Sequence, residues 1–173
     1  MSEKFCSVLV AFAFIVFTFS SCKYKEQWEQ VNVSNEFTME VPSWMEKTSE
    51  LKEGAMFQYR NRFRSVYAIV VKEKADTLPQ DFGAYVSANI AVLKNVLTNP
   101  VVSDSAVVEL DKLSGIRAEV FGNMGEEKIF YTHYTLKGNK GYNYQICAWT
   151  RGEDRKLKYN SDINRIIASF KQL

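Results

Sequence analysis

Residues 122–141, with the sequence GNMGEEKIFYTHYTLKGNKG, hold two turn clusters and the strand-like segment between them. Each cluster, 122–125 and 138–141, contains two glycines and an asparagine, which tolerate the positive φ angles of hairpin turns. Short turns make the strands on either side antiparallel neighbours. The stretch therefore predicts the centre of an antiparallel meander. Its strands are expected at residues 101–110, 112–122, 126–136 and 141–150.

Further strands are expected upstream of the meander. Phe37, Met39 and Val41 alternate with polar residues, which is the period-two pattern of a half-buried strand. Pro42 should end this strand, because proline cannot donate to a ladder. Residues 55–59 and 65–72 predict a hairpin. Its second strand carries apolar residues on both parities, so both of its faces are expected to be covered.

A long helix is predicted at residues 76–99. Asp76 or Thr77 is the expected cap, and Asn99-Pro100 is the expected stop. Its apolar stripe is interrupted only by Asn89 and needs a sheet beneath it. The stripe consists of Phe82, Tyr85, Val86, Ile90, Leu93 and Leu97.

A second amphipathic helix is predicted near the C-terminus. Its apolar face should pack on the same sheet, and its start is either Asn160 or Ser161 as cap or an earlier point near Glu153. The apolar residues of this helix are Ile163, Ile166, Ile167 and Phe170.

Two short motifs frame these elements, FTMEVPSW at 37–44 and IIASF at 166–170. With the order strand, hairpin, long helix, meander and closing helix, the chain resembles the PsbP/Mog1/DcrB-like superfamily over residues 36–171. The resemblance implies an α+β fold with a central antiparallel sheet of about six to seven strands and helices packed on its faces. It implies accessory, assembly, chaperone-like or binding roles and carries over no catalytic residue. Pro42 and Trp44 match the opening turn and are expected to be structural.

The N-terminus resembles an export signal. Lys4 precedes an uncharged apolar run at 5–19, which is shorter than the roughly 20 residues of a membrane span and has the length of a signal-peptide core. Phe19-Ser20-Ser21-Cys22 resembles the lipobox of bacterial lipoproteins, whose cysteine is acylated. We therefore expect a signal peptide at 1–21, lipidation of Cys22, a short spacer at 22–34 and one domain at 35–173. An uncleaved membrane anchor and an ordinary secreted protein are the alternatives.

Net charge, cysteine count and the absence of known motifs restrict the classes of function that the sequence supports. A formal net charge of +2 gives no general sign of nucleic-acid binding. If Cys6 leaves with the signal and Cys22 is acylated, Cys147 has no partner for an internal disulfide, so the core must hold the domain. Gly-rich phosphate loops and a Gly-x-Ser-x-Gly elbow do not occur, and Cys147 shows no ligand-like clustering with His133. We expect neither a cofactor nor a metal.

His133 is the single histidine and lies among strand tyrosines. Such a residue is typically hydrogen-bonded and structural. The alternative is a general base acting with a nearby hydroxyl or carboxylate.

Tyr131, Tyr142 and Tyr144 are expected on strands joined by one hairpin. They predict ordinary cross-strand pairing. The alternative is an exposed patch, shared with His133, for a protein, a glycan or an apolar ligand.

Arg60, Arg62 and Arg64 share one parity in the first hairpin. They favour a solvated turn whose charges protect a sheet edge. The alternative is a small site for an anion or a headgroup.

Together these features favour a membrane-anchored envelope lipoprotein acting as a non-enzymatic binding or assembly module, with an envelope protein or glycan as partner. An envelope hydrolase using His133 is one alternative. A carrier of a small apolar ligand is another, and it requires an apolar cavity of roughly several hundred Å³. Lys23 is not the aspartate that retains some lipoproteins at an inner membrane, so an outer membrane is expected.

Overall fold

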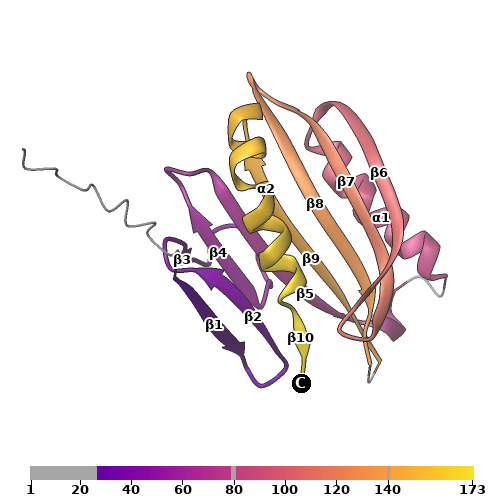
Figure 1. Ribbon diagram of the computed structural model, residues 1–173. Helices are drawn as coiled ribbons and strands as arrows, with labels where there is room; N and C mark the ends of the chain where they lie inside the picture. Colours follow the sequence, from indigo (N-terminus) through magenta and orange to yellow (C-terminus); the bar gives the residue numbers. More distant parts are fainter. Residues whose placement is uncertain (1–26, 79–80, 140) are drawn as a thin grey trace, which may run out of the picture.

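The computed structural model describes residues 27–78, 81–139 and 141–173, which form two antiparallel sheets and two α-helices (Figure 1). The strands are β1 (Trp28–Val33), β2 (Phe37–Pro42), β3 (Glu46–Lys47), β4 (Phe57–Asn61), β5 (Val66–Lys74), β6 (Thr98–Leu110), β7 (Leu113–Met124), β8 (Glu127–Lys137), β9 (Tyr142–Arg151) and β10 (Lys171–Gln172). The helices are α1 (Phe82–Asn95), α2 (Glu153–Ala168) and the short 3-10 helix η1 (Ala75–Thr77).

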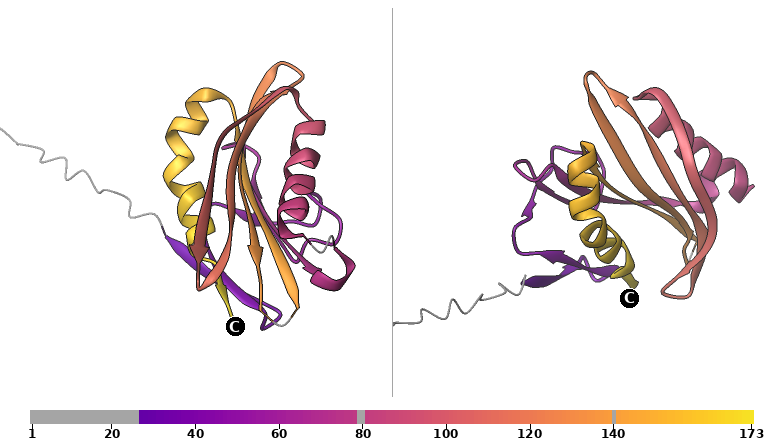
Figure 2. Two further views of the ribbon diagram at one scale, coloured as in Figure 1. Left: turned by 90° about the vertical axis from the view of Figure 1, so that its right-hand side faces the viewer. Right: turned by 45° about the horizontal axis from the view of Figure 1, so that its top comes forward.

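The central sheet has seven strands in the order β3-β4-β5-β9-β8-β7-β6, and a smaller sheet has the order β1-β2-β10. α1 and α2 cover opposite faces of the central sheet (Figure 2). The predicted α+β fold, with helices on both faces of an antiparallel sheet, is thus confirmed.

The main core lies between the central sheet, α2 and the small sheet. Burial of aliphatic and aromatic side chains is the dominant favourable term in folding, and this layer carries most of it. Its largest fully buried members include Phe37, Met39, Phe57, Leu136, Tyr144, Ile163, Ile166 and Phe170. A second, smaller cluster lies under α1 and includes Leu97, Ala118, Val120, Ile129, Tyr131 and Cys147.

The Ser-Phe end of α2 joins the first and last parts of the chain. The Ser169 hydroxyl accepts from the Glu40 backbone N–H at 2.7 Å and donates to the Ile166 carbonyl at 2.6 Å. The Phe170 ring lies 5.2 Å from the rings of both Phe37 and Tyr144. The Ser-Phe motif behind the family resemblance therefore makes contacts that hold the core together, so its role here is structural.

The meander is confirmed, with its first turn shorter than predicted and its second turn at the predicted residues 138–141. Met124 pairs with Glu127, so the first turn consists of Gly125 and Glu126, with Gly125 at φ +63°. Gly122 lies inside β7, where an added Cβ would come within 3.0 Å of the Leu97 side chain. This glycine admits a close approach of the chain that follows α1.

The predicted start of the long helix was wrong. Residues Ala75–Thr77 form η1, and Leu78 is extended with φ −108° and ψ 166°, as the residue before a proline prefers. α1 begins after Asp81, whose carboxylate accepts from the N–H groups of Gly83 and Ala84. The helix ends at Asn95, and Pro100 lies in the edge strand β6.

The predicted spacer ends too late. Trp28–Val33 forms β1 and pairs with β2 along its whole length. Only one face of the small sheet packs on the core, so β1 carries few apolar residues, among them Val31. This polar sequence is why the segment was predicted to be a spacer. The second predicted helix starts at Glu153, the earlier of the two expected positions.

The predicted signal peptide and lipidation site, including Cys22, lie outside the described residues. Within the described ranges, neither helix has the length and apolar character needed to cross a membrane.

Candidate functional site

A pocket of about 370 Å³ lies between α1 and the central sheet, on the face opposite to α2. Its walls are mainly apolar, with a few polar groups gathered on one side. The apolar lining comes from Leu51, Ile69, Val71, Val92, Leu93, Val96, Tyr131, Cys147 and Trp149, and the polar lining from Lys52, Glu73, Asn89, His133 and Gln145. A concave, mostly apolar site with a small convergent polar group is the usual form of a small-molecule site.

Each wall of the pocket follows from the local fold. Ile69 pairs with Cys147 and Val71 with Gln145 across β5 and β9, so these side chains form a continuous floor. α1 supplies the roof through residues at helical spacing, from Asn89 to Val96. The exposed side chains of Lys52 and Val92 lie at the rim.

Two polar residues of the pocket, Glu73 and Gln145, form a hydrogen-bonded triad with Tyr85 of α1. The Tyr85 hydroxyl donates to Glu73 Oε2 at 2.5 Å, and Gln145 Nε2 donates to the same oxygen at 2.5 Å. Burial, together with the hydrogen bond to this carboxylate, raises the pKa of Tyr85 to about 12, so Tyr85 stays a neutral donor. The triad fixes Glu73 as an acceptor and ties β5, α1 and β9 together.

His133 lies at the pocket wall but is only 2% exposed. Burial lowers its pKa to about 4, an effect that a side-chain hydrogen bond with Gln145 partly offsets. The imidazole is therefore neutral at physiological pH and a weak base. This supports the structural interpretation of His133 over the general-base alternative.

Asn89 is the residue that interrupts the apolar stripe of α1, and it faces the pocket. It is 9% exposed, and its Nδ2 is buried without a hydrogen-bond partner among the described residues. The amide influences the pKa of Tyr85 without reaching hydrogen-bond geometry. An unpaired buried donor costs about 1–3 kcal/mol, so its place in a pocket wall needs an explanation.

The alternative of an exposed tyrosine patch is wrong. Tyr131 lies under α1 with His133, whereas Tyr144 belongs to the core on the other face and is fully buried. Tyr142 is half-buried, with Lys72 Nζ 3.9 Å from its ring centre. The three tyrosines separate because β8 and β9 pair Leu136 with Tyr144, which places Tyr144 on the parity opposite to Tyr131.

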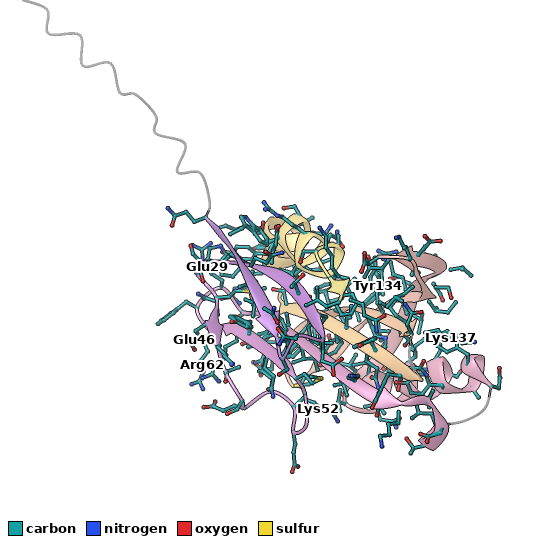
Figure 3. All side chains as sticks on the ribbon, turned by 90° about the horizontal axis from the view of Figure 1, so that it is seen from below. Glu29, Glu46, Lys52, Arg62, Tyr134 and Lys137 are labelled. Atoms are coloured by element: carbon teal, nitrogen blue, oxygen red, sulfur yellow. The ribbon has the colours of Figure 1, made fainter. Side chains whose placement is uncertain are left out.

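The three arginines do not converge. Arg60 and Arg62 both bind Glu50 Oε2, at 2.5 and 2.7 Å, at one margin of the domain where Arg62 and Glu46 are labelled in Figure 3. Arg64 instead lies 4.5 Å from the centre of the Trp44 ring. Ion pairing with Glu50, which lies in the segment before β4, and stacking on Trp44 support the structural interpretation of these charges over an anion site.

Cys147 forms part of the pocket floor, where burial raises its thiol pKa to about 12. It is therefore an unreactive thiol. Across the described ranges, histidine, cysteine and carboxylate side chains form no group of three or more suited to a metal ion.

No protein-family model and no curated protein sequence matches the chain. Solved structures do match it. PsbP (CyanoP) from the cyanobacterium Synechocystis has 13% identity and a TM-score of 0.59, covering 90% of this chain and 99% of its own. LpqN from Mycobacterium tuberculosis, described as involved in cell envelope biogenesis, has 15% identity and a TM-score of 0.58, covering 85% and 91%. The domain has the PsbP/Mog1-like fold.

Mog1p from Saccharomyces cerevisiae, a Ran-binding protein, also shares the PsbP/Mog1-like fold, with 10% identity, a TM-score of 0.56 and coverage of 85% and 96%. The superfamily resemblance is thus confirmed at the level of fold. Identities this low transfer no site residue, so the PsbP/Mog1-like pocket must be interpreted from its own side chains.

The sequence alone did not predict a binding pocket beneath α1. Glu73 and Gln145 are ordinary polar residues of strands, and no local motif predicts that they share one face with Tyr85. Asn89 was the available signal, because a carboxamide in an apolar helical stripe predicts a buried polar group.

Proposed function

We propose that the protein is a lipid-anchored module of the cell envelope that holds a small, largely apolar ligand in the pocket beneath α1 without transforming it. The pocket carries the proposal. Its volume of about 370 Å³ satisfies the requirement set by the carrier alternative and lies toward the lower end of the range for ligand sites. The ligand should therefore be small, about the size of a single-ring compound.

The side chains of the pocket favour binding over catalysis. His133, the histidine of the hydrolase alternative, is neutral and buried, and its pKa of about 4 makes it a weak base. Glu73 Oε2 accepts hydrogen bonds from two donors, and the Cys147 thiol has a pKa of about 12. A nucleophile activated by an adjacent base, which covalent catalysis requires, is not assembled from these groups.

The anchor and the envelope location rest on other grounds. The lipobox-like Phe19-Ser20-Ser21-Cys22 supports acylation of Cys22, and Lys23 supports an outer rather than an inner membrane. LpqN, which shares the fold, is involved in cell envelope biogenesis, and Mog1p binds Ran, so proteins of this fold act in an envelope and as binding partners. We propose an envelope protein or glycan as the partner that delivers or receives the ligand.

Filling the pocket tests the proposal. Val71 projects from β5 into the pocket, so Val71→Trp should occupy it and weaken the binding of ethylbenzene or acetophenone at least about 30-fold. The matched control is Val107→Trp, which places the same side chain on an 81% exposed position of β6. Binding is measured from the indole NMR signal of Trp149 in full-length protein held in lipid nanodiscs.

The two variants separate the outcomes. Val107→Trp should bind the probes as the unmodified protein does, while Val71→Trp should fold but leave the Trp149 signal unmoved. Equal binding by both variants, or no binding of any probe to the unmodified protein, contradicts a ligand site in this pocket.

A further inference from the structure

Glu73 and Gln145 are hydrogen-bonded within the pocket wall, whereas one buried donor is not. Glu73 Oε2 accepts from Tyr85 and Gln145, and the Gln145 side chain is also within 3.2 Å of the Tyr85 hydroxyl. Asn89 Nδ2 is buried in the pocket wall and has no partner among the described residues. What this pocket lacks is therefore an acceptor opposite Asn89.

We propose that the pocket takes a neutral ligand with an apolar body and one carbonyl-type acceptor, which receives a hydrogen bond from Asn89 Nδ2. This inference rests on the proposed function, because it specifies the ligand of the same pocket. The apolar body would lie against Ile69, Leu93 and Trp149, and the acceptor would point to α1. A site built to hydrogen-bond one ligand group discriminates against analogues that lack it, since its own polar group is then left unpaired.

Charged ligands fit this pocket less well. A carboxylate would be desolvated next to the Glu73 carboxylate, which adds repulsion to the cost of burial. An ammonium group is itself a donor, so it cannot accept from Asn89 Nδ2 and would leave that group unpaired while its own charge is desolvated. Lys52 lies at the exposed rim, where water screens its charge.

Four probes of nearly equal size test the ligand class: acetophenone, ethylbenzene, benzoate and α-methylbenzylamine. They are titrated at neutral pH into full-length protein in phosphatidylcholine nanodiscs, with the Asn89 side-chain amide and the Trp149 indole as NMR signals. Acetophenone should bind about three- to tenfold more tightly than ethylbenzene, as expected for one net hydrogen bond. It should also bind at least about tenfold more tightly than benzoate or the amine.

Asn89→Leu provides the decisive comparison, because leucine is similar in size and has no donor. This variant should bind acetophenone and ethylbenzene equally, with acetophenone losing about three- to tenfold. Thr150→Val is the matched control. It also removes a buried unpaired polar atom, but Thr150 lies on β9 at a position that does not line the pocket, so the preference for acetophenone should be unchanged.

The outcomes distinguish this inference from the function on which it rests. If the probes bind without preference, if the amine or benzoate binds best, or if Asn89→Leu keeps the preference for acetophenone, the ligand class is wrong while the pocket is still a binding site. If no probe moves the Trp149 signal, the proposed function fails and the ligand class fails with it.

Discussion

Replacing Cys22 by alanine should abolish incorporation of fatty acid into the protein and remove the proposed lipid attachment of the domain. An acyl chain contributes about 0.8 kcal/mol per buried methylene, and one chain alone binds a membrane only marginally. The two or three chains implied by the lipoprotein resemblance would hold the domain on the membrane, so their loss is an all-or-none effect. Cells are supplied with an alkyne-tagged fatty acid, and the label on the purified protein is measured.

Cys147→Ala is the matched control for this experiment. Cys147 is buried, and its thiol pKa is raised to about 12, so it should take no label, and its removal should leave the label intact. A Cys22→Ala protein that is labelled as strongly as the unmodified one would end the lipoprotein interpretation. An unlabelled protein that still fractionates with membranes would instead support an uncleaved anchor at residues 1–21.

The free energy of unfolding should fall as the pH drops from about 6.5 to about 4, because of His133. Burial holds its folded-state pKa near 4, whereas an exposed histidine titrates near 6.5. Between these values the unfolded chain binds more protons than the folded chain, so acid favours unfolding. The full difference corresponds to about 3 kcal/mol, which is a large part of the stability of an ordinary domain. Denaturant unfolding at several pH values measures it.

His133→Gln isolates this effect from the titration of carboxylates. Glutamine fills a similar space, keeps a hydrogen-bonding group next to Gln145 and does not titrate. The variant should therefore lose less stability than the unmodified protein over the same pH range. Identical pH dependence of the two proteins, or an imidazole that titrates near pH 6.5 by NMR, would show that His133 is accessible to water and free to act as a base.

The sequence predicted the framework of the fold because its signals are local. The turn clusters and the alternation of the strands placed the meander within a few residues, and the apolar spacing predicted both helices. The predictions failed for strands whose formation depends on tertiary contacts. β1 forms although its sequence is polar, because it pairs with β2, and β10 exists only through its pairing with the same strand.

The site was less predictable than the fold. Register decides which strand residues share a face, and a shift of one residue moves every side chain to the other side. The pairing of β8 with β9 placed Tyr144 in the main core and His133 under α1, which the sequence could not specify. The distance between Glu73 and Gln145 along the chain hides their contact in the same way.

The edge strand β6 of the central sheet has a consequence for association between copies of the domain. β6 is long and borders solvent, and an exposed strand edge is a template for pairing with another molecule. Its register shifts between Thr98 and Val101 and again between Val102 and Asp104, and Pro100 offers no N–H. Molecules confined to two dimensions collide often and in similar orientations. If the proposed lipid anchor confines the domain in this way, the irregular half of β6 should keep such encounters from propagating into a shared sheet.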